Sequence, residues 1–172
     1  MRIKKKILSK KVLYYAQVNM PKGFEIVRSD IVQDILLTNY YSDHKVPFNK
    51  SLDAIVKYVS DFMRVENHID LIVYNMRGLV FDKNESSKPM LEIDRNDLKN
   101  SPDMVMLYAA EVQDNTCEVV IEYDDNRRTS KEWSIPMENN RFIIFPSTER
   151  FTIKNKDNEY SNVIQLINFD YI

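Results

Sequence analysis

The chain has 172 residues, a length that suits one domain able to bury about two-thirds of the surface of its unfolded form. Its hydrophobic content of 44% and charged content of 29% exclude wholesale disorder, and its net charge of −2 excludes a global basic field that would draw the protein to nucleic acid or membrane. The only two glycines, Gly23 and Gly78, exclude glycine-rich phosphate loops and dinucleotide-binding fingerprints.

The single cysteine, Cys117, cannot form an internal disulfide, which fits a reducing compartment. It lies in a strand pattern without a histidine nearby, so we interpret it as a buried, inert thiol. No apolar run reaches membrane-spanning length and the N-terminus lacks a signal-peptide core. We therefore expect no membrane association.

Residues 1–11 are predicted to form a basic N-terminal arm, followed by a single domain over residues 12–172. We interpret the arm as a solvated terminus. The alternative is docking on an acidic partner or on nucleic acid, and we expect nucleic-acid contact nowhere else in the chain. The arm carries Arg2, Lys4, Lys5, Lys6, Lys10 and Lys11.

The first part of the domain, residues 12–68, is predicted to hold a strand and a helical flank. Val12–Val18 favours a strand, which the turn at Pro21–Gly23 closes. Ser29 is suited to cap a helix that extends to about Tyr40.

A second helix begins at Asn49 or Ser51, with Asp53 favourably placed in its first turn. We expect its apolar stripe to pack on a sheet, the alternative being a partner's groove. The stripe consists of Leu52, Ile55, Val56, Val59, Phe62 and Met63.

Residues 69–172 are predicted to form the β core, because short apolar or alternating segments recur there between turn signals. Such spacing favours a sandwich or barrel, so the fold class is mainly β (α+β). The predicted strands are Ile69–Tyr74, Gly78–Phe81, Met90–Ile93, Met104–Val112, Cys117–Tyr123, Glu132–Ile135, Arg141–Phe145, Arg150–Lys154 and Asn162–Tyr171.

The C-terminal order of elements is distinctive: an apolar strand, Phe145-Pro-Ser147, a short strand, the polar turn at residues 155–159 and a closing strand that ends in Asn168-Phe169. This order resembles the end of the 2-oxoglutarate/Fe(II)-dependent oxygenases, in particular the prolyl-hydroxylase-like proteins encoded by tailed phages. The resemblance covers about residues 70–172. It implies a double-stranded β-helix, or jelly roll, flanked by two N-terminal helices.

Oxygenases of this family need two histidines and one carboxylate on one face of Fe(II), with the other positions open to 2-oxoglutarate and O2. The chain has only His44 and His68. His68-Ile-Asp70 has His-x-Asp spacing, which would place both side chains on one face of the predicted strand. It lies before the region where the family's motif occurs, and no histidine follows it. We interpret His68 as a histidine at the start of a strand with an acidic neighbour.

The stretch similar to the family's motif is Lys88–Asp94. The resemblance places Glu92 near the first histidine, Asp94 at the carboxylate, Phe151 at the distal histidine and Asn162 near the basic residue that grips 2-oxoglutarate. A phenylalanine cannot bind iron, and an asparagine cannot form a bidentate ion pair with a carboxylate. We therefore predict no catalytic residue, no metal and no cofactor, and regard these four positions as vestigial.

Two alternatives remain open near these positions. Glu92 and Asp94 could bind a hard cation with Glu149, although paired acidic residues more often form a solvated face. Arg150 could fill the vacated pocket with a positive charge; we favour solvent exposure, because it alternates with Phe151.

The sequence thus favours a non-catalytic structural or interaction module, a virion component of a tailed phage in the neck, tail or baseplate. Its expected partners are other virion proteins, and its expected locations are the virion and, during assembly, the host cytoplasm. The apolar end at Leu166–Ile172, if exposed, could add to another subunit's sheet. The alternatives are a divergent Fe(II)/2-oxoglutarate oxygenase and a jelly-roll binding protein unrelated to virions.

Overall fold

A computed structural model describes residues 11–41, 49–126 and 129–172, without the side chains of residues 41 and 123–130. The arm apart from Lys11, and His44, lie outside the described residues. In chain order the elements are β1 (Tyr14–Gln17), α1 (Arg28–Tyr41), α2 (Lys50–Asn67), β2 (Leu71–Phe81), the 3-10 helix η1 (Leu98–Asn100), β3 (Met104–Glu111), β4 (Cys117–Asn126), β5 (Thr129–Pro136), β6 (Arg141–Pro146), β7 (Arg150–Asn155) and β8 (Asn162–Tyr171).

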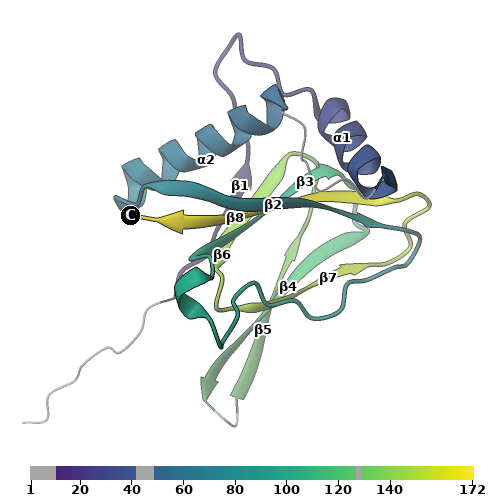
Figure 1. Cartoon of the computed structure of the whole chain (residues 1–172). Helices are drawn as coiled ribbons and strands as arrows, with labels where there is room; N and C mark the ends of the chain where they lie inside the picture. The colour runs from purple at the N-terminus through teal and green to yellow at the C-terminus, as the bar shows by residue number, and fades with distance from the viewer. Residues whose placement is uncertain (1–10, 42–48, 127–128) are drawn as a thin grey trace, which may run out of the picture.

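The strands form two antiparallel sheets that face each other (Figure 1). The larger sheet has the order β1-β6-β3-β8-β2, and the smaller has the order β5-β4-β7. Both helices cover the outer face of the larger sheet. The predicted fold class, mainly β with two N-terminal helices, is confirmed.

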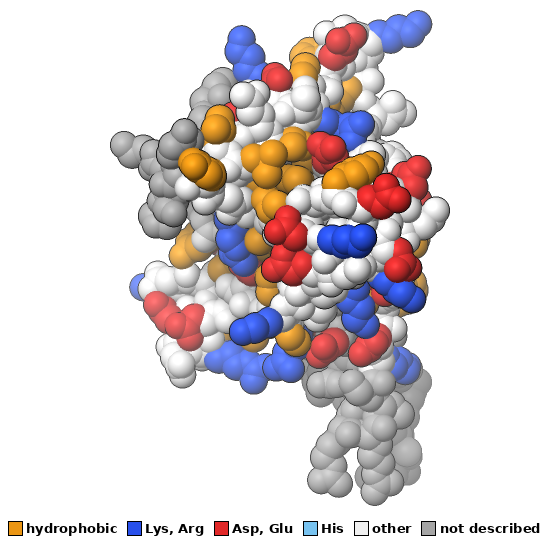
Figure 2. Space-filling model, turned by 90° about the vertical axis from the view of Figure 1, so that its right-hand side faces the viewer, with side chains coloured by type: hydrophobic (Ala, Val, Ile, Leu, Met, Phe, Trp, Pro, Cys, Tyr) orange, Lys and Arg blue, Asp and Glu red, His pale blue; other side chains and the backbone are white. Residues whose placement is uncertain are grey.

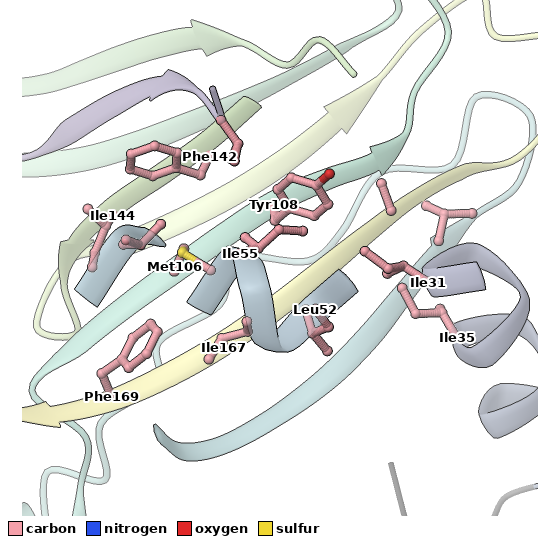
Figure 3. Close-up of a cluster of buried hydrophobic side chains, with 14 of the residues drawn as sticks. Ile31, Ile35, Leu52, Ile55, Met106, Tyr108, Phe142, Ile144, Ile167 and Phe169 are labelled. Carbon is pink, nitrogen blue, oxygen red and sulfur yellow. The ribbon is translucent and has the colours of Figure 1, made fainter. Parts of the chain in front are cut away.

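One hydrophobic layer lies between the helices and the larger sheet (Figure 3). The even-numbered residues of β3, such as Met106 and Tyr108, point to the helices, as the period of two in a strand requires. The helices contribute Ile35 and Ile55. The stripe of α2 therefore packs on a sheet, as the sequence predicted. At Gly78 of β2 an added Cβ would lie 2.3 Å from the Ile35 side chain, so α1 can approach the sheet this closely only over a glycine.

The other hydrophobic layer fills the space between the two sheets. Val105, Leu107 and Ala109 of β3 point into it. They meet residues of β4 and β7 from the smaller sheet, among them Ile121 and Phe151. This is the space in which the resemblance would place a metal.

The starts of the two helices were predicted with unequal success. Of the two caps predicted for α2, Asn49 and Ser51, the structure has Asn49, since its side-chain oxygen accepts hydrogen bonds from the N–H groups of Ser51 and Leu52 at 2.9 and 3.1 Å. The cap predicted at Ser29 is wrong, because α1 already begins at Arg28. The Asp30 N–H donates to the Val27 carbonyl at 3.2 Å, so the first turn forms ahead of Ser29.

The strands predicted at Ile69–Tyr74 and Gly78–Phe81 are one strand, β2. A bulge between Val73 and Asn75 changes which face successive residues occupy. Before the bulge Val73 packs toward the helices, and after it Phe81 packs between the sheets. The alternation is broken at that point, which is why the sequence suggested two strands.

Two further predictions are corrected. The strand expected at Met90–Ile93 is only an isolated bridge between Met90 and Phe151. The closing strand β8 is not an exposed edge, because it lies between β3 and β2 and is buried over most of its length. Only Tyr171 at its end and Ile172 after it are exposed, so the hypothesis that this strand adds to a neighbour's sheet is wrong.

On the surface, charges of both signs are interspersed over the face shown in Figure 2. Hydrophobic side chains gather near the top of that view, in the part of the molecule formed by the helices. α1 indeed exposes Leu36 and Leu37. Neither of the two described α-helices combines the length and hydrophobicity needed to span a membrane.

Candidate functional site

The position assigned to the distal histidine, Phe151, lies in the hydrophobic layer between the sheets. Phe151 is the second residue of β7, pairs with Ile121 of β4 and is 0% exposed. On its other side it exchanges two backbone hydrogen bonds with Met90, at 2.8 and 3.0 Å. Its ring meets that of Phe145 edge to face, with the centroids 5.2 Å apart. The backbone of Phe151 is thus fully paired, and its ring lies within the hydrophobic layer.

Glu92, the position assigned to the first histidine, is held by an arginine and an amide. Its side chain is 6% exposed, and its two oxygens accept a bidentate pair from Arg77 of β2 at 2.8 and 2.5 Å. One of these oxygens also accepts from the side-chain nitrogen of Asn168 of β8, at 2.8 Å. Asn168 donates as well to Asn75 at 2.9 Å, while its own buried side-chain oxygen lacks a partner among the described residues. Glu92 thus ties its loop to two strands of the larger sheet.

Asp94 lies apart from this cluster, at the surface. Its side chain accepts from the Asn96 N–H at 2.8 Å, which is the local bonding of a turn. Within the described ranges no three histidine, cysteine or acidic side chains come together in a way that could hold a metal. The structure therefore does not gather Glu92, Asp94 and Glu149 into the group suggested for a hard cation.

Asn162, the position assigned to the residue that grips 2-oxoglutarate, lies at the far end of β7 from Phe151 and is fully buried. Its side-chain oxygen accepts from the Gln113 N–H at 2.9 Å. Its nitrogen donates to Asn155 at 2.7 Å and to Thr116 at 3.1 Å. The Asn155 nitrogen in turn donates to the Glu85 carbonyl at 2.8 Å. Both N–H groups and the oxygen of the Asn162 amide are thus bonded within the protein.

His68 does not stand on a strand. It ends α2 in the left-handed conformation, with φ 56°, and its N–H donates to the Arg64 carbonyl at 3.1 Å. The carboxylate of Asp70 forms an ion pair with the Arg64 side chain. The expectation that His68 and Asp70 share one face of a strand is wrong, because the helix extends farther than the sequence suggested.

Arg150 and Cys117 lie as expected. Arg150 is exposed and stands 3.9 Å from Glu122 at the surface. Cys117 is buried, and this burial raises the pKa of its thiol from the ordinary 9.0 to about 12, with a smaller contribution from Glu118.

A groove that no local sequence pattern predicts lies between the open edges of the two sheets. The groove has a volume of about 490 Å³ and lies beside Phe145. Its walls include Tyr15 from β1 and Trp133 from β5, and the ion pair between Lys11 and Glu149 lies in it. The alternation of apolar residues could place Trp133 on the inner face of β5. Only the pairing of distant strands brings it to one groove with Tyr15 and Glu149.

Comparison with known proteins bears on the fold. No family model matches the sequence, and no curated protein matches it. A prolyl-4-hydroxylase from Pseudomonas putida superimposes with a TM-score of 0.64 at 8% identity, over 92% of this chain and 88% of the other. This chain has the fold of the double-stranded β-helix oxygenases.

Two more solved structures agree. The non-heme alpha ketoglutarate dependent epimerase SnoN, from nogalamycin biosynthesis, gives a TM-score of 0.65 at 5% identity, over 93% of this chain and 78% of the other. AviO1 from Streptomyces viridochromogenes gives 0.63 at 10% identity, over 93% and 90%. Identities this low establish the double-stranded β-helix and leave the chemistry open.

Proposed function

We propose that the protein is a non-catalytic interaction module built on the double-stranded β-helix of the oxygenases. The observation that carries the proposal is the environment of Phe151. A fully buried aromatic ring, packed edge to face on Phe145, stands where the resemblance requires an iron ligand. A phenylalanine offers no donor atom to Fe(II), so a ligand from elsewhere would have to displace packed side chains.

The residues around Glu92 support the same proposal. Both of its oxygens are engaged by Arg77, and a metal there would face a guanidinium cation. The set formed by Phe151, Glu92 and Arg77 does not fit an Fe(II) site of two histidines and a carboxylate. In our proposal the loop of Glu92 is joined to the larger sheet by the ion pair with Arg77 and not by a metal ion.

Turnover of 2-oxoglutarate tests the proposal against the alternative of a divergent oxygenase. The alternative draws on the fold and on Asp94, the one position retained in kind. Purified full-length protein is incubated with Fe(II), ascorbate and 2-oxoglutarate, and succinate is measured, with a prolyl hydroxylase as the positive control. We expect succinate at the level of the buffer alone. Succinate formation that Asp94→Ala abolishes would establish the oxygenase and overturn the proposal.

We further propose that the module is a virion component of a tailed phage, in the neck, tail or baseplate, with other virion proteins as partners. The support for this part is the sequence resemblance to phage-encoded proteins. The expected locations are the virion and, during assembly, the host cytoplasm. Mass spectrometry of purified particles tests it: we expect the chain at a copy number that matches a symmetric ring. Its absence from intact particles would leave a binding protein unrelated to virions.

A further inference from the structure

The groove between the sheet edges combines aromatic walls with a buried carboxylate. Tyr15 and Trp133 come from different sheets and are each 51% exposed, while Phe145 beside them is fully buried. Large aromatic side chains exposed on both sides of a groove are typical of a binding surface.

Glu149 supplies the charge. Its side chain is only 5% exposed, and it lies directly before the strand residues Arg150 and Phe151. A carboxylate this far from water needs a cation or several hydrogen-bond donors. Within the described ranges it receives the Lys11 ammonium at 2.6 Å and the Thr148 hydroxyl at 3.1 Å.

Lys11 is a replaceable partner. It is 51% exposed, and it reaches Glu149 as a single point charge on a flexible stem. A guanidinium group can instead pair with both carboxylate oxygens and lie flat on an aromatic face.

We propose that this groove receives an arginine side chain of a partner protein, which pairs with Glu149 in place of Lys11 and stacks on Trp133 or Tyr15. The inference deepens the proposed function and rests on it, since the groove is taken as a contact surface for a partner and not as the entrance for a substrate.

Charge complementarity selects this occupant. An anionic ligand would meet the Glu149 carboxylate, and an apolar one that displaced Lys11 would leave that carboxylate buried without a cation. The methylene groups of an arginine can cover the aromatic walls while its charge reaches Glu149. Lys11 competes with the partner's arginine for the Glu149 carboxylate. The apparent affinity for the arginine is therefore lower than the intrinsic affinity, because only molecules in which Lys11 has left the carboxylate can bind it.

The chain's single tryptophan is Trp133, so tryptophan emission, excited at a wavelength that the ten tyrosines do not absorb, reports on this groove. The probe is the capped tripeptide acetyl-Leu-Arg-Leu-amide, titrated into the full-length protein, with calorimetry as a second readout. The matched control replaces arginine with citrulline, which keeps the shape and removes the charge. We expect saturable binding of the arginine peptide, and binding of the citrulline peptide about tenfold weaker or more. Equal binding of the two peptides, or no binding of either, overturns the inference.

Two variants assign the contacts. Glu149→Gln keeps the volume of the side chain, and we expect it to weaken the arginine peptide by about tenfold or more. Lys11→Met removes the competitor, and we expect it to strengthen binding by about threefold or more. Far-UV circular dichroism verifies that both variants fold. Unchanged affinity in folded Glu149→Gln overturns the inference. The succinate assay does not involve Glu149, so succinate formation would refute the non-catalytic role while leaving the peptide result as a separate outcome.

Discussion

The buried polar groups at the two ends of β7 differ in how they are bonded: Asn162 lies beside the end at Asn155, and Glu149 lies beside the end at Arg150. At the far end, Asn162 is enclosed with its oxygen and nitrogen both bonded to the Gln113, Thr116 and Asn155 groups around it. At the near end, the buried carboxylate of Glu149 relies on a half-exposed lysine and a neighbouring hydroxyl. Asn162 completes a closed network, whereas Glu149 holds a partner that another cation can replace.

The difference shows how structural polar groups can be told from groups available for binding. A buried amide whose bonds all go to neighbouring segments stabilises the fold and has no capacity left for a ligand. A buried charge paired with one half-exposed lysine retains the capacity to exchange its partner. By this criterion the candidate contact surface lies at the near end, next to Phe151.

The largest expected effect on stability comes from removing the aromatic ring of Phe151 at the near end of β7. Phe151→Ala removes a ring that is fully buried against Phe145. We expect the free energy of unfolding to fall by about 3 to 5 kcal/mol, from lost burial and the cavity left behind. Urea denaturation measures it. The matched control is Phe24→Ala, whose ring is 66% exposed and should change stability by less than about 0.5 kcal/mol. A small loss at Phe151 would mean that the near end is loosely packed.

The closed network is tested by Asn162→Ala. This change leaves the Gln113 N–H and the Asn155 oxygen without the partner seen in the structure. We expect a loss of about 2 to 3 kcal/mol in urea denaturation, since buried groups left unpaired carry their full desolvation cost. The exposed Asn19→Ala is the control. Equal effects of the two substitutions would contradict the contrast between the two ends.

A smaller effect is expected at Glu92. Glu92→Gln keeps the shape but removes the charge that pairs with Arg77, whose side chain is 46% exposed. We expect a loss of about 1 to 2 kcal/mol, because solvent weakens the pair at the arginine side. A double-mutant cycle with Arg77→Met isolates the coupling. A gain in stability for Glu92→Gln would show that the ion pair does not hold the loop of Glu92 to the larger sheet.

The smallest effect is a pH dependence at the closed end, where Cys117 pairs with Asn155 of β7. Burial raises the pKa of the folded thiol from 9.0 to about 12, so between these values the unfolded chain binds fewer protons. Stability is unaffected by this group well below pH 9 and falls as the pH rises through 9 toward 12. The loss amounts to about 1 kcal/mol from pH 9 to pH 10.

In Cys117→Ala the contribution of the thiol to the pH dependence of the free energy of unfolding should be absent. Tyrosine ionisation affects both proteins, so the difference between them gives the contribution of the thiol. Denaturation at pH 9 and 10 measures the slope. Equal slopes in the wild type and the variant would mean that water reaches the thiol and that the end near Asn155 is open.

Much of the fold followed from local patterns. The stripe on α2 and the apolar strand β8 are set by spacing along the chain, and the structure confirms them; of the two predicted caps it selects Asn49. The bulge in β2 could not be predicted, because it depends on pairing with β8, more than 80 residues away in the chain. For the same reason the sequence suggested β8 as an edge: nothing local reveals which strands flank it.

The candidate site was predicted less well. The resemblance singled out Glu92 and Phe151, and the structure shows what surrounds them. The partners of Glu92 come from β2 and β8, which are distant in sequence. The groove was missed because its residues come from β1, β5 and the turn before β7. Lys11 appeared only as part of the basic arm, since a charge pattern does not disclose a partner 138 residues away in the chain.

The iron content of the purified protein tests the central claim most directly. Cells are grown with supplemented iron, the full-length protein is purified without chelators, and metals are quantified by mass spectrometry. Because Phe151 offers no donor atom and Arg77 engages Glu92, we predict iron below about one-tenth of an equivalent per chain. Iron near one equivalent, lost in Asp94→Ala, would contradict the account.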